Sequence, residues 1–323
     1  MKKNYKIKMY LKHKNFNMNL KQKISSSLLV FFMTLVSHAQ QDPQFTDYMF
    51  NTLTVNSAYA GSRGHLSVTG LHRSQWVGLE GAPETQSLSI ESPIGKNVGL
   101  GVSVVNDRLG PSDEFYLDAN FSYTLKLSND KKLSFGIKGG GRLLNIDWSR
   151  GSFQESEDVF NSGNINNRFL PTIGAGIYLH SDKSYIGLSV PNFLTNEHYD
   201  GLQGAVAAER LHFFLIAGKV FDLSPRIKFK PAFLGKFVTG APIIADLSAN
   251  FMFNDVFRLG AAYRWDDSVS GLVGLQIGPR LMLGYAYDFT TTELQNFNSG
   301  THEIMLRFEL RSKERQLKSP RFF

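Results

Sequence analysis

The stretch that decides the fold class is residues 115–127, FYLDANFSYTLKL. Its odd-numbered residues are almost all apolar, from Phe115 and Leu117 to Leu127, whereas its even-numbered residues, such as Asp118 and Asn120, are polar or carry a polar group. A period of two is the pattern of a β-strand with one apolar and one wet face. The sequence therefore predicts a strand whose two faces meet different environments.

The same alternation recurs along the chain, for example in residues 257–266, 281–289 and 302–311. Fourteen strands are expected, give or take two, at 64–77, 85–92, 97–106, 115–127, 131–145, 170–180, 184–190, 209–221, 226–239, 243–253, 256–266, 269–277, 280–290 and 301–311. An even number of strands is typical of bacterial outer-membrane barrels. The predicted fold class is therefore all-β, a single transmembrane antiparallel β-barrel over residues 64–311.

The connections between these strands sort by parity. If the first connection is outer, the outer ones are 78–84, 107–114, 146–169, 191–208, 240–242, 267–268 and 291–300, and they include every long one. The inner connections are short and rich in turn residues, as in Ser128-Asn129-Asp130. Short periplasmic turns and longer outer loops characterise membrane barrels, whereas a soluble sandwich has no reason to sort loop lengths this way.

The charge and the N-terminus indicate an exported protein. The 323-residue chain has a formal charge of +7, but residues 1–39 contain eight Lys and no acidic residue or Arg, which leaves −1 for the remainder and disfavours nucleic-acid binding. The apolar run Leu28–Val36 is too short to span a bilayer and is followed by Ser37-His38-Ala39, so residues 1–39 are predicted to be a cleaved signal peptide, with Met1 or Met18 as the start. If this exported protein is integral to a membrane, it is expected to be a closed barrel, because only helices and closed barrels can span lipid. The expected location is the outer membrane.

Two terminal segments lie outside the predicted barrel. Residues 40–63 contain Phe45, Tyr48, Phe50 and Tyr59 and are expected to pack against something such as the barrel lumen, as a periplasmic or plug segment. The alternative is that this segment only finishes the barrel. Residues 312–323 are expected to be a basic C-terminal tail.

The search for catalytic and metal-binding groups supports no site. The chain has no Cys, its eight His show no ligand spacing, and Gly-x-Ser-x-Gly is absent, so no metal, cofactor or enzymatic activity is expected. Gly99-Leu100-Gly101 and Gly139-Gly140-Gly141 resemble pieces of phosphate loops, but no helix follows them, and they are interpreted as strand glycines.

Several motifs together resemble one known family. Asp42 to Asn51 (DPQFTDYMFN) and Asn56 to Gly64 (NSAYAGSRG) are similar to the opening signature of the PorP/SprF family of Bacteroidetes type IX secretion outer-membrane proteins. The resemblance continues through Arg73-Ser74-Gln75-Trp76 and Gly81 to Gln86 (GAPETQ), and reaches Gly300 to Glu303 (GTHE). It departs at Ser57, where the family commonly has Pro.

The resemblance implies a function and a set of residues. It implies a non-enzymatic barrel that works with periplasmic and outer-membrane secretion components and assists the export or surface anchoring of a partner, such as a gliding-motility adhesin. The residues expected to carry partner docking are Asp42, Pro43, Phe45, Tyr48, Asn51, Asn56, Tyr59, Gly61, Gln75, Trp76, Gly81, Pro83 and Thr85. The alternative function is a passive outer-membrane channel for hydrophobic or small solutes. An outer-membrane acyl hydrolase and a soluble secreted β-protein are the remaining rivals.

Overall fold

The computed structural model describes residues 45–128, 130–150, 164–194, 210–239 and 241–310. The predicted signal peptide, the C-terminal tail, Asp42 and Pro43 lie outside these ranges. In the part of the chain that the structure describes, no helix is both long and apolar enough to cross a membrane.

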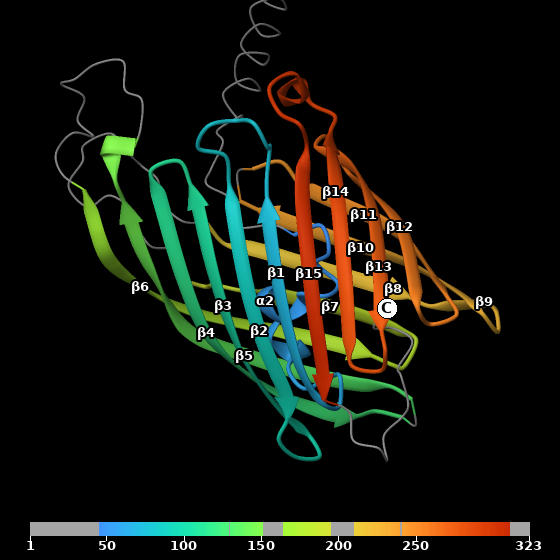
Figure 1. The fold of residues 1–323 in the computed structure, drawn as a ribbon. Coiled ribbons are helices and arrows are strands. Elements are labelled where there is room, and N and C mark those ends of the chain that lie inside the picture. Colours follow the sequence, from blue (N-terminus) through green and yellow to red (C-terminus); the bar gives the residue numbers. More distant parts are fainter. Residues whose placement is uncertain (1–44, 129, 151–163, 195–209, 240, 311–323) are drawn as a thin grey trace, which may run out of the picture. The chain divides into compact units, whose positions relative to one another are not determined.

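Antiparallel strands form one closed ring (Figure 1). The strands are β1 (Leu66–Ser74), β2 (Glu84–Pro93), β3 (Val98–Leu109), β4 (Ser112–Lys126), β5 (Lys132–Ile146), β6 (Ile165–His180), β7 (Ser184–Val190), β8 (His212–Lys219), β9 (Phe221–Ser224), β10 (Ile227–Val238), β11 (Ile244–Phe253), β12 (Phe257–Arg264), β13 (Ser268–Ile277), β14 (Leu281–Thr290) and β15 (Thr301–Leu310). Neighbours in sequence pair with each other, except that β8 and β9 both pair with β10, and β1 pairs with β15 along Leu66–Ser74 to close the ring.

The ring has fourteen strands, because β8 and β9 are two parts of one strand. Only Val220 separates them, and both pair with β10. The predicted fold class and strand number are confirmed. The strand expected over 209–221 is interrupted at Val220, an irregularity that residue alternation does not show.

Two predicted boundaries are wrong in the same way. The outer loop expected at 107–114 is a short turn at Gly110 and Pro111, because β3 continues to Leu109 and β4 begins at Ser112. Similarly, β6 begins at Ile165, five residues before the expected start. These strand ends carry polar residues such as Asn106 and Asp113, which are also typical of loops. They are polar on both faces because the strands extend beyond the lipid there, so the alternation that marks a strand is lost.

The alternating residues of 115–127 lie on opposite sides of the barrel wall, with the apolar ones outside and the polar ones inside. Leu117 is 50% exposed on the outside of β4, whereas Asp118 is 5% exposed inside. Leu283 and Leu306 repeat the outward pattern on β14 and β15. The apolar face is the one that contacts lipid, and the polar residues face the lumen.

The two ends of the ring differ in their connections. One end has the short connections 94–97, 127–131, 181–183, 225–226, 254–256 and 278–280, and the other has the longer ones, including 75–83 and 291–300, the latter drawn in red in Figure 1. The structure therefore keeps the predicted sorting by parity, apart from the short turn at 110–111. By the rule for outer-membrane barrels, the short-turn end is periplasmic and the long-loop end extracellular.

Among the residues that the structure describes, helical structure is confined to short pieces. These are α2 (Thr52–Val55) and the 3₁₀ turns η1 (Ser57–Tyr59), η2 (Trp148–Arg150) and η4 (Glu293–Asn296). Both α2 and η1 lie within the ring, where α2 contacts β2 and β3 and η1 contacts β4, β5 and β6 (Figure 1). Residues 45–63, here called the luminal segment, therefore share their surroundings with the inward side chains of the wall.

Candidate functional site: the luminal segment and the extracellular rim

The luminal segment begins in a buried ionic cluster. The Asp47 carboxylate accepts two hydrogen bonds from Arg258 of β12, at 2.9 and 3.0 Å, and neither side chain is exposed. The backbone N–H groups of Thr46 and Asp47 donate to the two oxygens of the Glu303 carboxylate, at 2.9 and 2.7 Å. A bidentate arginine pair and a carboxylate that accepts two backbone N–H groups both fix geometry as well as charge. The start of the segment is therefore tied to β12 and β15.

Arg73 of β1 completes this cluster. It donates to Thr46 Oγ1 at 2.7 Å and to Glu303 at 2.9 Å, and it pairs with Asp288 of β14 at 2.8 Å. Every one of these side chains is at least 95% buried. Since a buried charge is tolerated only when it is paired and hydrogen-bonded, the wall and the segment satisfy each other's charges.

Phe50 lies among three cations of the wall. The Arg258 and Arg307 guanidinium carbons are 4.3 and 4.5 Å from its ring centroid, and Lys230 Nζ is 5.5 Å away. Arg307 also donates to the Phe50 carbonyl oxygen at 3.0 Å. Cation–π contacts are strongest when the cation is desolvated, as these are. Phe50 was not among the predicted docking residues, although it belongs to the signature that contains them.

Five of the predicted docking residues are buried inside the barrel: Phe45, Tyr48, Asn51, Asn56 and Tyr59. Asn51 bonds Ser87 and Ser89 of β2, and Asn56 donates to the Ile177 carbonyl of β6 at 3.2 Å. Tyr59 packs edge-on against Tyr178 at 5.6 Å. Tyr48 is buried, and this burial raises the pKa of its hydroxyl far above the ordinary value. These residues are held against the wall, so they are not available at the molecular surface.

The segment ends at the periplasmic end. Gly61 N–H donates to Glu91 of β2 at 2.8 Å, and Arg63 pairs with both Glu91 and Glu309 of β15. Gly61 has φ +70°, and a Cβ there would lie 2.7 Å from the Gly99 Cα. A side chain at this position would be both strained and obstructed. The segment thus joins β1 by a turn fitted closely to the wall.

Two glycines of the wall make room for the segment. A Cβ on Gly99 would lie 2.1 Å from the Ala60 carbonyl oxygen, and a Cβ on Gly136 would lie 2.1 Å from the Ala58 nitrogen. The sequence alone predicts Gly99 as a strand glycine and assigns no role to Gly136. Their position on the inward face of a strand is the sequence signal that could have found them, because an inward glycine marks a close approach of another backbone.

The other predicted docking residues lie at the extracellular rim. Gln75 and Trp76 follow β1, Gly81 and Pro83 precede β2, and Thr85 lies at the start of β2, where it bonds Asp107 at 2.5 Å. Thus the structure separates the predicted set into a luminal group and a rim group.

Main-chain hydrogen bonds tie the rim loops together. Val77 donates to Gly300 at 2.9 Å and Ser299 donates back to Val77 at 2.7 Å, which joins the loop after β1 to the loop after β14. Gly110 donates to Gly81 at 2.9 Å and so adds the β3–β4 turn. We call residues 75–83, 110–111 and 291–300 the rim platform. Its exposed apolar side chains are Val77, Leu79, Leu294 and Phe297.

Among the described residues, no group of three His, Cys, Asp or Glu side chains could hold a metal ion. The ion pairs of Asp47 and Arg63 join the luminal segment to the wall. Their chemistry is that of a lock between two parts of one chain.

The family described as type IX secretion system membrane protein PorP/SprF matches residues 37–308. This chain belongs to the PorP/SprF family. The predicted resemblance and the predicted outer-membrane location are therefore confirmed. In this PorP/SprF protein, the matched range contains the luminal segment, the rim platform and all the strands except the last two residues of β15.

Solved structures similar to this PorP/SprF protein are outer-membrane barrels. The outer-membrane protein Omp33 of Acinetobacter baumannii is 9% identical, over 76% of this chain and 98% of that one, with a TM-score of 0.45. The CymD monoaromatic hydrocarbon channel is 14% identical, over 77% and 88%, with a TM-score of 0.47. The toluene transporter TbuX of Ralstonia pickettii is 11% identical, over 82% and 93%, with a TM-score of 0.42. None of the curated proteins matches this chain.

Proposed function

We propose that this barrel is a non-enzymatic component of the type IX secretion apparatus that holds a secreted partner, such as a gliding-motility adhesin, at the cell surface. Membership of the family supports a role beside the secretion machinery. The partner would dock on the extracellular rim platform, and periplasmic secretion components would contact the short-turn end.

The observation that carries this proposal is the ordered apolar surface of the rim platform. Val77 and Leu79 are each 38% exposed and Phe297 is 68% exposed, although their loops are fixed by main-chain hydrogen bonds. Exposed apolar groups on a rigid support favour protein docking, because little conformational entropy is lost when the partner binds. A conducting pore would gain nothing from such a surface.

The passive channel is the rival function, and the luminal segment argues against it. The segment crosses the lumen from the Arg73 cluster to the Glu91 pair and is bonded at both ends. Solute flow would require these buried ion pairs to open. We therefore favour docking over conduction.

The test is the double variant Leu79→Glu/Phe297→Glu, which places two charges on the platform. We expect the barrel to reach the outer membrane and surface display of one large secreted protein to fall at least tenfold, while general secretion continues. Ile94→Glu is the matched control, because Ile94 is an exposed aliphatic residue at the opposite end of the barrel. Unchanged display in the double variant, or equal loss in the control, would contradict the proposal.

A further inference from the structure

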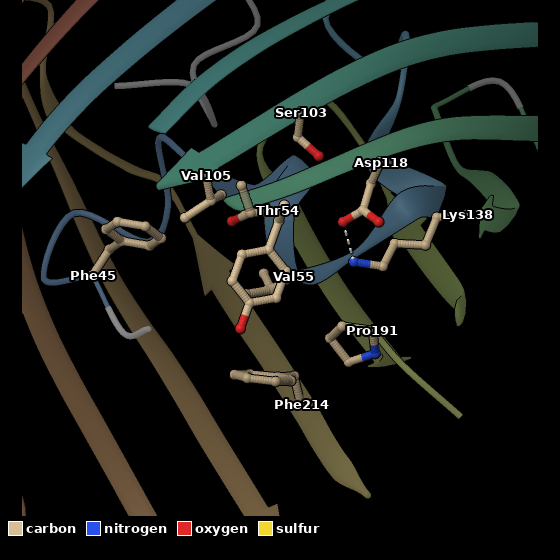
Figure 2. Close-up of a pocket in the computed structure, with 10 residues that line it drawn as sticks. Phe45, Thr54, Val55, Ser103, Val105, Asp118, Lys138, Pro191 and Phe214 are labelled. Carbon is tan, nitrogen blue, oxygen red and sulfur yellow. Dashed lines mark hydrogen bonds and ion pairs between the residues drawn. The ribbon is translucent and has the colours of Figure 1, made fainter. Parts of the chain in front are cut away.

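A small cavity of about 70 Å³ lies between the luminal segment and the barrel wall (Figure 2). Val55 of α2 and the Phe45 side chain line it from the segment, and Val105 of β3 and Phe214 of β8 line it from the wall. Figure 2 shows these apolar groups around one side, with the Asp118–Lys138 pair on the other. The cavity is therefore mostly apolar with a polar border.

The cavity lies toward the extracellular end of the segment's contacts with β3. The close contacts of the segment with β3 are at Gly99 and Gly101, near the periplasmic start of that strand. The cavity is lined by Ser103 and Val105, which come later as β3 runs toward the extracellular rim. A group that reaches the cavity from outside the cell would thus rest on α2.

The polar border carries no unsatisfied charge toward the cavity. Lys138 Nζ donates to Asp118 Oδ2 at 2.7 Å, and Thr172 Oγ1 donates to Asp118 Oδ1 at 2.5 Å. A charged group placed here would find no free counter-charge and would lose its hydration. The cavity therefore selects a neutral, apolar occupant.

The volume decides what kind of occupant this is. Pockets for whole ligands span about 300–1,000 Å³, and a dry cavity of about 150 Å³ accommodates benzene. A cavity of about 70 Å³ has room for a group of about four carbons. Burying only that much gives a free molecule a dissociation constant on the order of millimolar. The same group is useful as an anchor when it belongs to a larger contact.

We propose that this cavity receives one branched aliphatic side chain, Val, Leu or Ile, of the secreted polypeptide, inserted into the lumen from the extracellular end. The inference rests on the proposed function, since it names the chemistry by which the docked partner is recognised. The inserted side chain would touch both α2 and the wall, and so it would also stabilise the luminal segment in place.

The test uses a small aliphatic diazirine amino acid incorporated at Val105 of the full-length protein in its own outer membrane. The matched control is the same residue at Val102, which is on the same strand but is 45% exposed on the lipid face. We expect irradiation to give a polypeptide adduct at Val105 at least ten times stronger than at Val102. Mass spectrometry should place the attachment beside an aliphatic residue of the partner.

Filling the cavity provides the competing measurement. Ser103→Leu fills it from the wall, and Val55→Phe fills it from the luminal segment, so one variant serves if the other fails to assemble. Either change should reduce the Val105 adduct at least tenfold while the barrel keeps its heat-dependent gel mobility. Persistence of the adduct in a filled, folded variant would overturn the inference, as would attachment beside a charged residue or adducts only with lipid or within this chain.

A third position separates the two proposals. The diazirine residue at Leu79 reports docking on the rim platform. An adduct at Leu79 without one at Val105 would refute the cavity inference and leave the proposed function standing. Absence of both adducts would refute both.

Discussion

The lock between Asp47 and Arg258 gives the sharpest prediction about the luminal segment. Asp47→Asn keeps the size of the side chain but removes its charge, so the Arg258 guanidinium remains buried without its carboxylate. Both side chains are fully buried in the native protein. Removing one partner of a buried pair typically costs about 3–5 kcal/mol, since the remaining charge is uncompensated.

That cost shifts the equilibrium between two states, one with the luminal segment bound to the wall and one with it displaced. Displacement lets water reach Arg258, so the variant avoids the penalty only by releasing the segment. Since 1.4 kcal/mol is a factor of ten, the displaced population should rise about 10²- to 10⁴-fold. The wall itself keeps its strand pairing, because Arg258 lies within a β12 strand bonded on both sides to β11 and β13.

The assay is ion conductance of the purified protein in planar bilayers, together with protease cleavage of residues 45–63 in intact barrels. The native protein should conduct poorly, and Asp47→Asn should conduct in long bursts and become cleavable. The double variant Asp47→Leu/Arg258→Leu removes the unpaired charge and should return toward native behaviour, since buried pairs can be replaced by apolar groups at little cost. Native conductance and protection in Asp47→Asn, or a double variant as leaky as the single one, would refute this reasoning.

Three further changes test the wall and the segment. Gly136→Ala forces a Cβ to 2.1 Å from the luminal segment's main chain and should cost about 1–3 kcal/mol in urea titrations, whereas Gly139→Ala, with nothing within 4 Å, should stay within about 0.5 kcal/mol. Ala119→Arg, outward and mid-strand, should destabilise the barrel by about 2–4 kcal/mol and Leu125→Arg, near the periplasmic end, by about 0–1 kcal/mol; equal costs would contradict the lipid-facing assignment. Ser57→Pro should stabilise the protein by about 0.4–1 kcal/mol and so raise its melting temperature slightly, because Ser57 begins η1 after an extended residue. A lower melting temperature would show that the proline ring does not fit at this position.

The wall of the barrel can be predicted from the sequence because the alternation within each strand is a local pattern. Whether Leu117 faces lipid and Asp118 faces the lumen depends only on alternation, and the observed exposures follow it. The strand ends do not follow from alternation, because β3 and β4 extend beyond lipid and lose their apolar face there. The interruption at Val220 depends on how two neighbouring strands pair with β10, which no single-strand pattern contains.

The luminal contacts could not be predicted from the sequence for a different reason. Asp47 and Arg258 are 211 residues apart, and Thr46 and Glu303 are 257 apart. Residue types indicate that inward charges need partners. The alternation of β12 and β15 places Arg258, Glu303 and Arg307 on the polar faces of these strands. The residue types do not indicate which charge meets which. The family signature selected the luminal residues as a group, but it did not indicate which wall residue each of them contacts.

The position of the luminal segment suggests why a barrel of this size keeps it. An eight-strand barrel is filled by its own side chains, whereas a fourteen-strand ring leaves space that its wall cannot fill. The ring closes where β1 meets β15, strands that lie at opposite ends of the folded chain. Closing such a long loop is entropically costly. The segment bonds Glu303 of β15 through two backbone N–H groups and accepts a hydrogen bond from Arg73 of β1 at Thr46, so it binds both sides of this closure. Its only helix has four residues, too short to be stable alone, and it gains its structure from the wall whose closure it supports. The segment therefore stabilises the closed ring through its contacts with β1 and β15.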